Sequence, residues 1–150
     1  MRTVTSSVDL NATPQKVWGL LTDTNLHSSW NPFITRMKGS LHVGSKLEVR
    51  IEPPGARPMN FRPTVTEVEP NRRLAWLGRF LIRGLFDGAH SFTLEALPQG
   101  RTPLIQSESF RGVLVPFSRT LLAKTAAGFE AMHQAMSNRI DGGSGGSATD

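Results

Sequence analysis

The N-terminal part of the chain changes from the residue spacing of a strand to that of helices. Apolar residues at even positions among polar ones predict a strand over residues 3–10. Thr13 followed by Pro14 is typical of a helix start, because threonine caps free N–H groups and proline tolerates the first helical position. The apolar residues that follow predict a short helix to about residue 23, and residues 25–30 predict a second helical turn.

The middle of the chain, from residue 33 to 112, alternates short apolar runs with turn residues. Leu47, Val49 and Ile51 alternate with charged residues before two prolines and a glycine interrupt the pattern. This region is expected to hold about six strands, joined by turns. The clearest of them cover residues 47–51, 61–68, 74–77, 89–97 and 102–112.

The last element is expected to be the longest. Apolar residues recur every three or four positions from about Phe117 to Ile140, which predicts an amphipathic helix of more than twenty residues. We expect this helix to pack into the concavity of a sheet. The residues expected on its packed face are Leu121, Leu122, Phe129 and Met136.

The order of these elements predicts the fold class. One strand, two short helices, a run of strands and one long helix indicate an α+β domain with an antiparallel sheet, because the helices are segregated from the strands. We expect one domain over residues 1–141. Residues 142–150 are rich in glycine and serine and are expected to form a flexible tail.

Composition narrows the possible chemistry. The 150 residues contain no cysteine, which excludes disulfides, thiolate metal sites and cysteine nucleophiles. The four histidines are not spaced as metal ligands on a helix, so no metal or other cofactor is expected. No signal peptide or spanning segment is evident, so a cytoplasmic location without integral membrane association is the expectation. The net charge of +5 comes from scattered basic residues, so nucleic acid is not the expected partner.

Five short segments form a pattern along the chain. They are ATPQKVW (12–18), WNPF (30–33), GAHSFTLE (88–95), QSESFRG (106–112) and GFEAM (128–132). In this order they resemble the START-related or SRPBCC (birch-pollen-allergen-like) superfamily. The similarity is closest to its bacterial polyketide cyclase/dehydrase and lipid-transport branch and covers about residues 1–141.

This resemblance implies a helix-grip fold. In that fold a curved antiparallel sheet of about seven strands wraps around the long C-terminal helix and encloses an apolar cavity. The superfamily contains carriers, cyclases, hydrolases and regulatory domains on one scaffold, so the resemblance specifies the fold more closely than the function.

The hairpin over residues 89–112 places polar groups in this interior. If its turn centres on Gln99, His90 lies opposite Glu108, Phe92 opposite Gln106, and the apolar pairs beside them define the inner face. Three interpretations of the inward His90–Glu108 pair remain open. The pair could be structural, it could orient the polar end of a ligand, or it could act in acid–base catalysis.

Further candidates for a cavity wall come from the aromatic and methionine residues, although each of them could equally be part of a packed core. Gly128, in the middle of the long helix, indicates a close backbone approach, a kink or room for a ligand. The expected ligand-binding residues are Trp30, Phe61, Trp76, His90, Phe92, Gln106, Glu108, Phe129 and Met132.

Three functions fit these observations. The first is a carrier or sensor that binds a hydrophobic small molecule or lipid in an internal cavity. The second is a polyketide cyclase or dehydratase with His90 and Glu108 as acid and base. The third is a protein-binding or ribosome-associated regulator, which a basic groove on the outer sheet face would favour. We expect non-catalytic binding, by a monomer or weak homodimer.

Overall fold

The computed structural model describes residues 1–79 and 82–143. Five strands form one antiparallel sheet in the order β1-β8-β7-β6-β5, and three form a second in the order β2-β3-β4. Two 3₁₀ turns, η1 (Pro98–Gly100) and η2 (Val115–Phe117), lie on either side of β8. The helices are α1 (Pro14–Thr22), α2 (His27–Trp30) and α3 (Arg119–Gly143). The strands are β1 (Arg2–Leu10), β2 (Ile34–Lys38), β3 (Glu48–Ile51), β4 (Met59–Phe61), β5 (Thr64–Glu69), β6 (Arg73–Arg79), β7 (Asp87–Leu94) and β8 (Thr102–Arg111).

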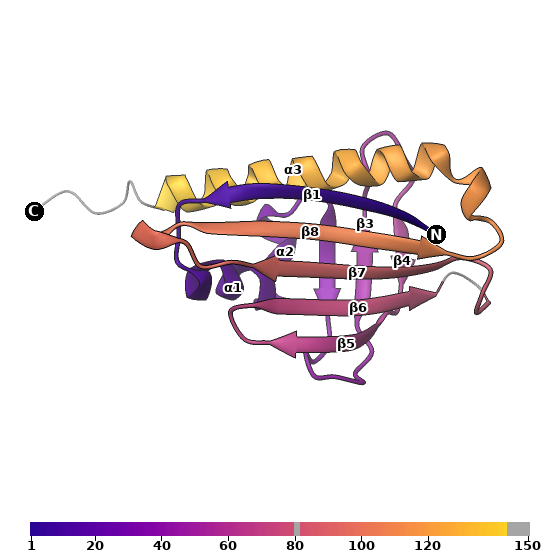
Figure 1. The fold of residues 1–150 in the computed structure, drawn as a ribbon, viewed down its shortest axis with the longest axis horizontal. Coiled ribbons are helices and arrows are strands. Elements are labelled where there is room, and N and C mark those ends of the chain that lie inside the picture. Colours follow the sequence, from indigo (N-terminus) through magenta and orange to yellow (C-terminus); the bar gives the residue numbers. More distant parts are fainter. Residues whose placement is uncertain (80–81, 144–150) are drawn as a thin grey trace, which may run out of the picture.

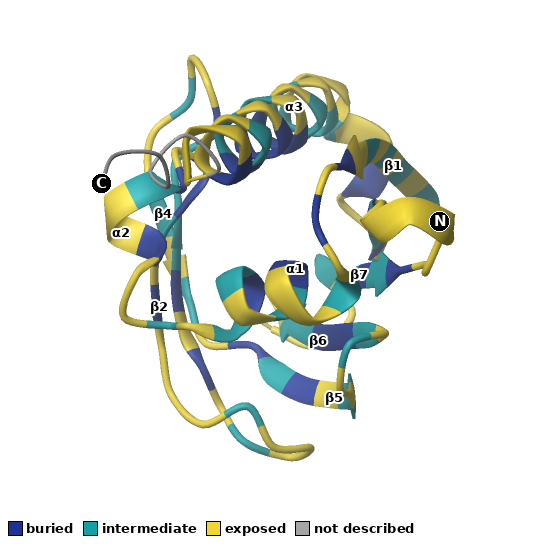
Figure 2. Ribbon diagram, turned by 90° about the vertical axis from the view of Figure 1, so that its left-hand side faces the viewer, coloured by how far each residue is buried: buried dark blue, intermediate teal, exposed yellow. Residues whose placement is uncertain are grey.

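The strands curve around α3, which runs along the full length of the five-stranded sheet (Figure 1). Viewed from one end, α3 bridges β1 and the three-stranded sheet, while α1 lies across that end of the interior (Figure 2). Most of the side chains that point inward from the two sheets and from α3 are buried. This arrangement confirms the predicted α+β helix-grip architecture.

The number of strands differs from the expectation of about seven, because one expected strand is two. Residues 61–68 were expected to be continuous, whereas β4 ends at Phe61 and β5 begins at Thr64. Pro63 lies between them and has no N–H group to donate to a ladder. Its carbonyl accepts a hydrogen bond from Leu47 at 2.9 Å, and Lys46 forms an isolated bridge with Thr64. The two sheets are therefore joined at this point.

The junction between α2 and β2 is built around Asn31, which is 3% exposed. Its Oδ1 accepts hydrogen bonds from the backbone N–H groups of Phe33 and Ile34, at 3.0 and 2.9 Å. Its Nδ2 donates to Nδ1 of the buried His27, whose Nε2 lies 2.8 Å from the Leu21 carbonyl. Three elements are thus tied together, and the side chain of Phe33 is directed into the interior.

Helix α3 begins two residues later than expected, and its packed face confirms the prediction for Phe129 and Met136 only. Phe117 belongs to η2 and is 85% exposed, and both Leu121 and Leu122 are only partly buried. The expectation that both leucines belong to the packed face was therefore wrong. The buried residues of α3 are Thr125, Gly128, Phe129, Met132, His133, Met136 and Ile140. The helix continues through Gly143, and residues 144–150 of the expected tail lie outside the described residues.

Gly128 allows a close approach between α3 and Phe33. A Cβ atom at position 128 would lie 2.3 Å from Cδ2 of the Phe33 ring, closer than real Cβ atoms come to other atoms. The same ring packs edge-on against Phe129, with 5.7 Å between centroids. Of the three explanations for this glycine, the structure shows the close approach, here by an aromatic side chain.

Candidate functional site

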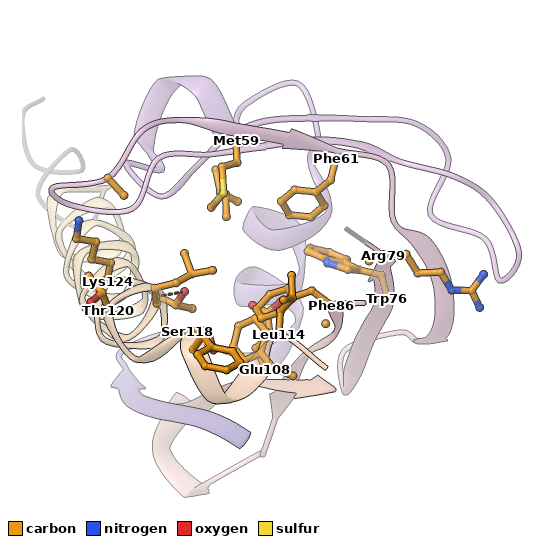
Figure 3. Close-up of a pocket in the computed structure, with 18 residues that line it drawn as sticks. Met59, Phe61, Trp76, Arg79, Phe86, Glu108, Leu114, Ser118, Thr120 and Lys124 are labelled. Atoms are coloured by element: carbon orange, nitrogen blue, oxygen red, sulfur yellow. Dashed lines mark hydrogen bonds between the residues drawn. The ribbon is translucent and has the colours of Figure 1, made fainter. Parts of the chain in front are cut away.

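A pocket of about 550 Å³ lies beside the first turns of α3 (Figure 3). Its walls come from the β3–β4 region, from the ends of β6, β7 and β8, and from the connection between β8 and α3. Apolar side chains dominate this lining. They are Ile51, Ala56, Met59, Phe61, Trp76, Phe86, Phe110, Leu114, Phe117 and Leu121.

Six of the residues that line the pocket have polar side chains, namely Arg79, Glu108, Ser118, Thr120, Lys124 and Thr125. Glu108 on β8 contributes a carboxylate to the pocket wall. Lys124 and Arg79 lie on opposite flanks, and the guanidinium of Arg79 points away from the pocket (Figure 3). Nζ of Lys124 donates a hydrogen bond to the Gly55 carbonyl at 2.7 Å. The site is therefore an apolar space with a single carboxylate on its wall.

The predicted hairpin register is confirmed. His90 pairs with Glu108, Phe92 with Gln106, and all four side chains belong to the inner face. Next to this pair, Gly88 leaves room for the carboxylate. A Cβ atom at position 88 would lie 2.7 Å from Oε1 of Glu108.

Hydrogen bonds fix both the position and the tautomer of His90. Its Nδ1 lies 3.1 Å from Oε2 of Glu108, and its Nε2 lies 3.2 Å from Nε2 of Gln106. Because an amide NH₂ group only donates, Nε2 of His90 must accept and Nδ1–H must donate to the carboxylate. The His90 ring also stacks on Trp76, with 5.0 Å between centroids and 13° between planes. His90 thus donates to Glu108 from behind the pocket wall.

The hydrogen bonds continue from Gln106 to the edge of α3. Nε2–H of His133 donates to Oε1 of Gln106 at 2.9 Å, and Nδ1 of His133 lies 3.4 Å from the Ser6 hydroxyl. Ser6 in turn donates to Glu130. Burial lowers the pKa of His133, and the negative charge of Glu130 partly opposes this shift. Polar side chains therefore follow one another from the pocket carboxylate to the outer surface between β1 and α3. The single Ser6 proton is donated to Glu130, so the 3.4 Å contact between Ser6 and Nδ1 of the neutral His133 ring has no proton to share.

The expected site residues fall into three groups. Phe61, Trp76 and Glu108 line the pocket, and His90 supports Glu108. Four others are buried in the interior without being part of the pocket lining, namely Phe92, Gln106, Phe129 and Met132. Trp30 also lies outside the lining. It is partly buried on α2, with its ring 5.3 Å from that of His27.

Sequence reasoning missed the residues contributed by connections. Met59 lies on a three-residue strand, Phe86 precedes β7, and Leu114 and Phe117 belong to the segment between β8 and α3. None of these positions has a regular apolar period. The sequence did contain one indication of these pocket residues: they are large apolar residues in segments whose spacing fits neither a strand nor a helix.

Among residues 1–79 and 82–143, no group of three or more histidine, aspartate or glutamate side chains is arranged to hold a metal ion. The same part of the chain contains no helix that is long and apolar enough to cross a membrane.

Comparison with known proteins places the chain on a familiar scaffold. The family model described as polyketide cyclase / dehydrase and lipid transport matches residues 1–139. No curated protein sequence matches the chain at a significant level.

Similar solved structures share the fold at low sequence identity. The Zhui aromatase/cyclase from a Streptomyces species is 14% identical, with a TM-score of 0.78 and 99% of each chain covered. A protein from Mesorhizobium loti is 23% identical, with a TM-score of 0.74, over 93% of this chain and 97% of that one. A START superfamily protein from Mycobacterium smegmatis is 18% identical, with a TM-score of 0.72 and coverage of 93% and 97%.

Proposed function

The chain belongs to the polyketide cyclase/dehydrase and lipid-transport family, and we propose that it binds a hydrophobic small molecule or lipid in its pocket, as a carrier or sensor. The observation that carries this proposal is the apolar pocket of about 550 Å³ with one fixed carboxylate. Apolar walls supply most of the binding free energy, and a small number of fixed polar groups set the orientation of the ligand.

Glu108 determines which polar end the ligand presents. One carboxylate oxygen is held by His90, and the other packs against Gly88, while Glu108 is part of the pocket lining. An ionised carboxylate only accepts hydrogen bonds. The ligand therefore has an apolar body with a hydroxyl or amine group that donates to Glu108.

Native mass spectrometry of freshly purified protein tests for a bound ligand, and an anilinonaphthalene sulfonate dye provides a probe for the natively folded domain. Leu121 lines the pocket, while its neighbour Leu122 is similarly half-buried but lies outside the lining. Leu121→Asp should weaken dye binding by about tenfold or more, because it places in the apolar site a negative charge that also repels the sulfonate of the dye. Leu122→Asp is the matched control. Equal binding by both variants, or dye uptake only after tertiary structure is lost, would refute the proposal.

A cyclase or dehydratase-type enzyme is the second candidate. The specific observation in its favour is that Glu108 faces the pocket while Nδ1–H of His90 donates to it. Such a carboxylate can accept a proton from a substrate that is held against the apolar wall. If this candidate is correct, Glu108→Gln should lower turnover of a polyketide-like substrate by about 10²–10⁴ while binding persists. Turnover that is unaffected by this change would exclude a catalytic role for Glu108.

The outer face of the five-stranded sheet tests the regulator hypothesis, which a basic groove on this face would favour. Hydroxyl pairs run along it, with Thr3 next to Ser109 and Thr5 next to Ser107, each at 3.0 Å. Arg73 on the same face is paired with Glu67 at 2.6 Å. These residues do not form a basic groove, but a groove of about 530 Å³ at the β5–β6 edge of the same face is lined by Lys46, Arg62 and Arg79 and by no acidic side chain. That groove is the specific observation in favour of the regulator hypothesis. The expected monomer or weak homodimer stays a prediction.

A further inference from the structure

Exposed apolar side chains gather at one end of the molecule. The described residues include eight large hydrophobic side chains that are strongly exposed, and five of them lie where the β6–β7 and β8–α3 connections meet the N-terminus (Figure 1). We call these five residues the apolar tip. They are Met1 (76% exposed), Ile82 (71%), Val113 (69%), Leu114 (44%) and Phe117 (85%).

The backbone holds the apolar tip in place. N–H groups of Val113 and Leu114 donate to the carbonyls of Gly84 and Leu85, at 3.3 and 3.2 Å. Gly112 has a φ of 132°, and a Cβ there would lie 2.4 Å from the Leu85 carbonyl oxygen. Only glycine fits this contact. The two connections therefore form one surface built to keep its apolar side chains outside the core.

Arginines outnumber acidic residues next to the apolar tip, where Asp87 lies in register between Arg79 and Arg111. Arg79 and Arg83 lie on the β6–β7 side, and Arg111 and Arg119 lie at the two ends of the β8–α3 connection; all four are exposed. Arg119 is the first residue of α3, where a positive charge is unfavourable for the helix dipole. None of the four forms an ion pair within the described part of the chain. The arginines that do are Arg36, Arg50, Arg72, Arg73 and Arg101.

We propose that the apolar tip docks on an anionic lipid surface. Exposed apolar side chains enter the boundary between headgroups and acyl chains, and the surrounding arginines bind lipid phosphates. Apolar insertion or arginine–phosphate binding alone gives weak attachment, and the two interactions together give stable but reversible attachment to the lipid surface. Leu114 and Phe117 belong both to the tip and to the pocket wall, so docking brings the pocket against the lipid surface.

A second copy of this chain is a less suitable occupant. An isologous dimer through the tip would bring two rings of unpaired arginines face to face. Their repulsion opposes the apolar contact, whereas an anionic surface neutralises the same charges. Charge complementarity therefore favours lipid over self-association.

Co-sedimentation with lipid vesicles tests the proposal. The full chain should bind vesicles of phosphatidylcholine mixed with phosphatidylglycerol, bind vesicles of phosphatidylcholine alone about tenfold or more weakly, and dissociate at high salt. The double variant Ile82→Ser/Val113→Ser removes apolar contacts without altering the pocket lining. It should lose vesicle binding by about tenfold or more.

Matched controls lie elsewhere on the surface. Val43 is 66% exposed outside the tip, and Arg139 is an exposed cation about 30 Å along α3 from Arg119. Arg83→Glu/Arg119→Glu should abolish binding to the anionic vesicles, while Val43→Ser and Arg139→Glu should bind like the parent protein.

Equal binding to neutral and anionic vesicles, or equal losses in the control variants, would overturn the proposal. A second combination of results would also overturn it. In that case the parent protein does not bind vesicles, and sedimentation equilibrium shows a dimer that the double variant Ile82→Ser/Val113→Ser dissociates. Dye uptake by the pocket is independent of docking in these variants, because neither Ile82 nor Val113 lines it. Failure of docking can therefore be separated from failure of ligand binding.

Discussion

Helix α3 faces the same curved sheet along its whole length, yet its two halves border different interiors. From Gly128 onward its buried face packs directly against the core, and Phe33 fills the space beside it. Before Gly128, residues Leu121, Lys124 and Thr125 border the open pocket. We call these regions the closed half and the pocket half.

The difference shows how one scaffold combines stability with a binding site. In the closed half, Gly128 has no Cβ, so the Phe33 ring can pack directly against α3. The backbone of Phe33 is held by its hydrogen bond to the side chain of Asn31. His90 lies at the boundary, stacked on Trp76 of the pocket wall and edge-on to Phe129 of the core, with centroids 5.0 and 5.5 Å apart. Stability should therefore depend mainly on the closed half and ligand binding mainly on the pocket half.

The largest expected effect is in the closed half. Phe129 is 0% exposed, so Phe129→Ala should lower the free energy of unfolding by about 3–5 kcal/mol through lost burial and a new cavity. Leu121→Ala, in the pocket half, should cost less than about 1 kcal/mol, because this side chain already borders open space. Urea unfolding of both variants measures the difference. Similar losses would mean that the two halves are equally packed.

A larger side chain at Gly128 tests how tightly the closed half is packed. Gly128→Ala should destabilise by about 1–3 kcal/mol, because the new methyl group overlaps the fixed Phe33 ring. Gly19 in α1 is the matched control, since a Cβ there meets nothing within 4 Å. Gly19→Ala should stabilise by about 0.5–1 kcal/mol through helix propensity. Weaker dye binding by a folded Gly128→Ala protein would instead assign Gly128 to the pocket half.

Much of this arrangement could be predicted from the sequence, because local rules determine it. The short turn around Gln99 and the alternation of apolar residues determine the His90–Glu108 register. The pocket outline could not be predicted, because Met59, Phe86 and Leu114 come from irregular or very short segments. The packed face of α3 was predicted only in part, since its spacing does not show where the sheet ends and the pocket begins.

The pH dependence of stability tests the buried histidines, His27 near α1 and His133 on α3. Burial lowers the pKa of both below the ordinary 6.5, so the folded protein binds fewer protons than the unfolded chain. Their contribution to stability is full above pH 6.5 and is lost as the pH falls through 6.5 toward the lowered values. The loss should not exceed about 1.4 kcal/mol per pH unit for each histidine.

Urea unfolding between pH 7.5 and about 5 measures this slope. The double variant His27→Gln/His133→Gln provides the comparison, because glutamine can still donate and accept hydrogen bonds but does not titrate in this range. Its stability should change less steeply with pH. An identical slope in parent and variant would show that other groups control the acid response.

The smallest expected effect on stability is at Glu108, on the pocket side of the boundary. Glu108→Gln keeps an oxygen that can accept from His90 Nδ1–H, and its side chain is already 17% exposed. We therefore expect a change in unfolding free energy below about 1 kcal/mol. Ligand preference should change much more, because the only carboxylate in the pocket lining becomes neutral. A pair of amphiphilic probes with the same apolar body, one with an amine and one with a sulfonate, measures this by titration. The parent should prefer the amine and Glu108→Gln should lose that preference, whereas a large loss of stability with unchanged preference would assign the His90–Glu108 pair to the closed half.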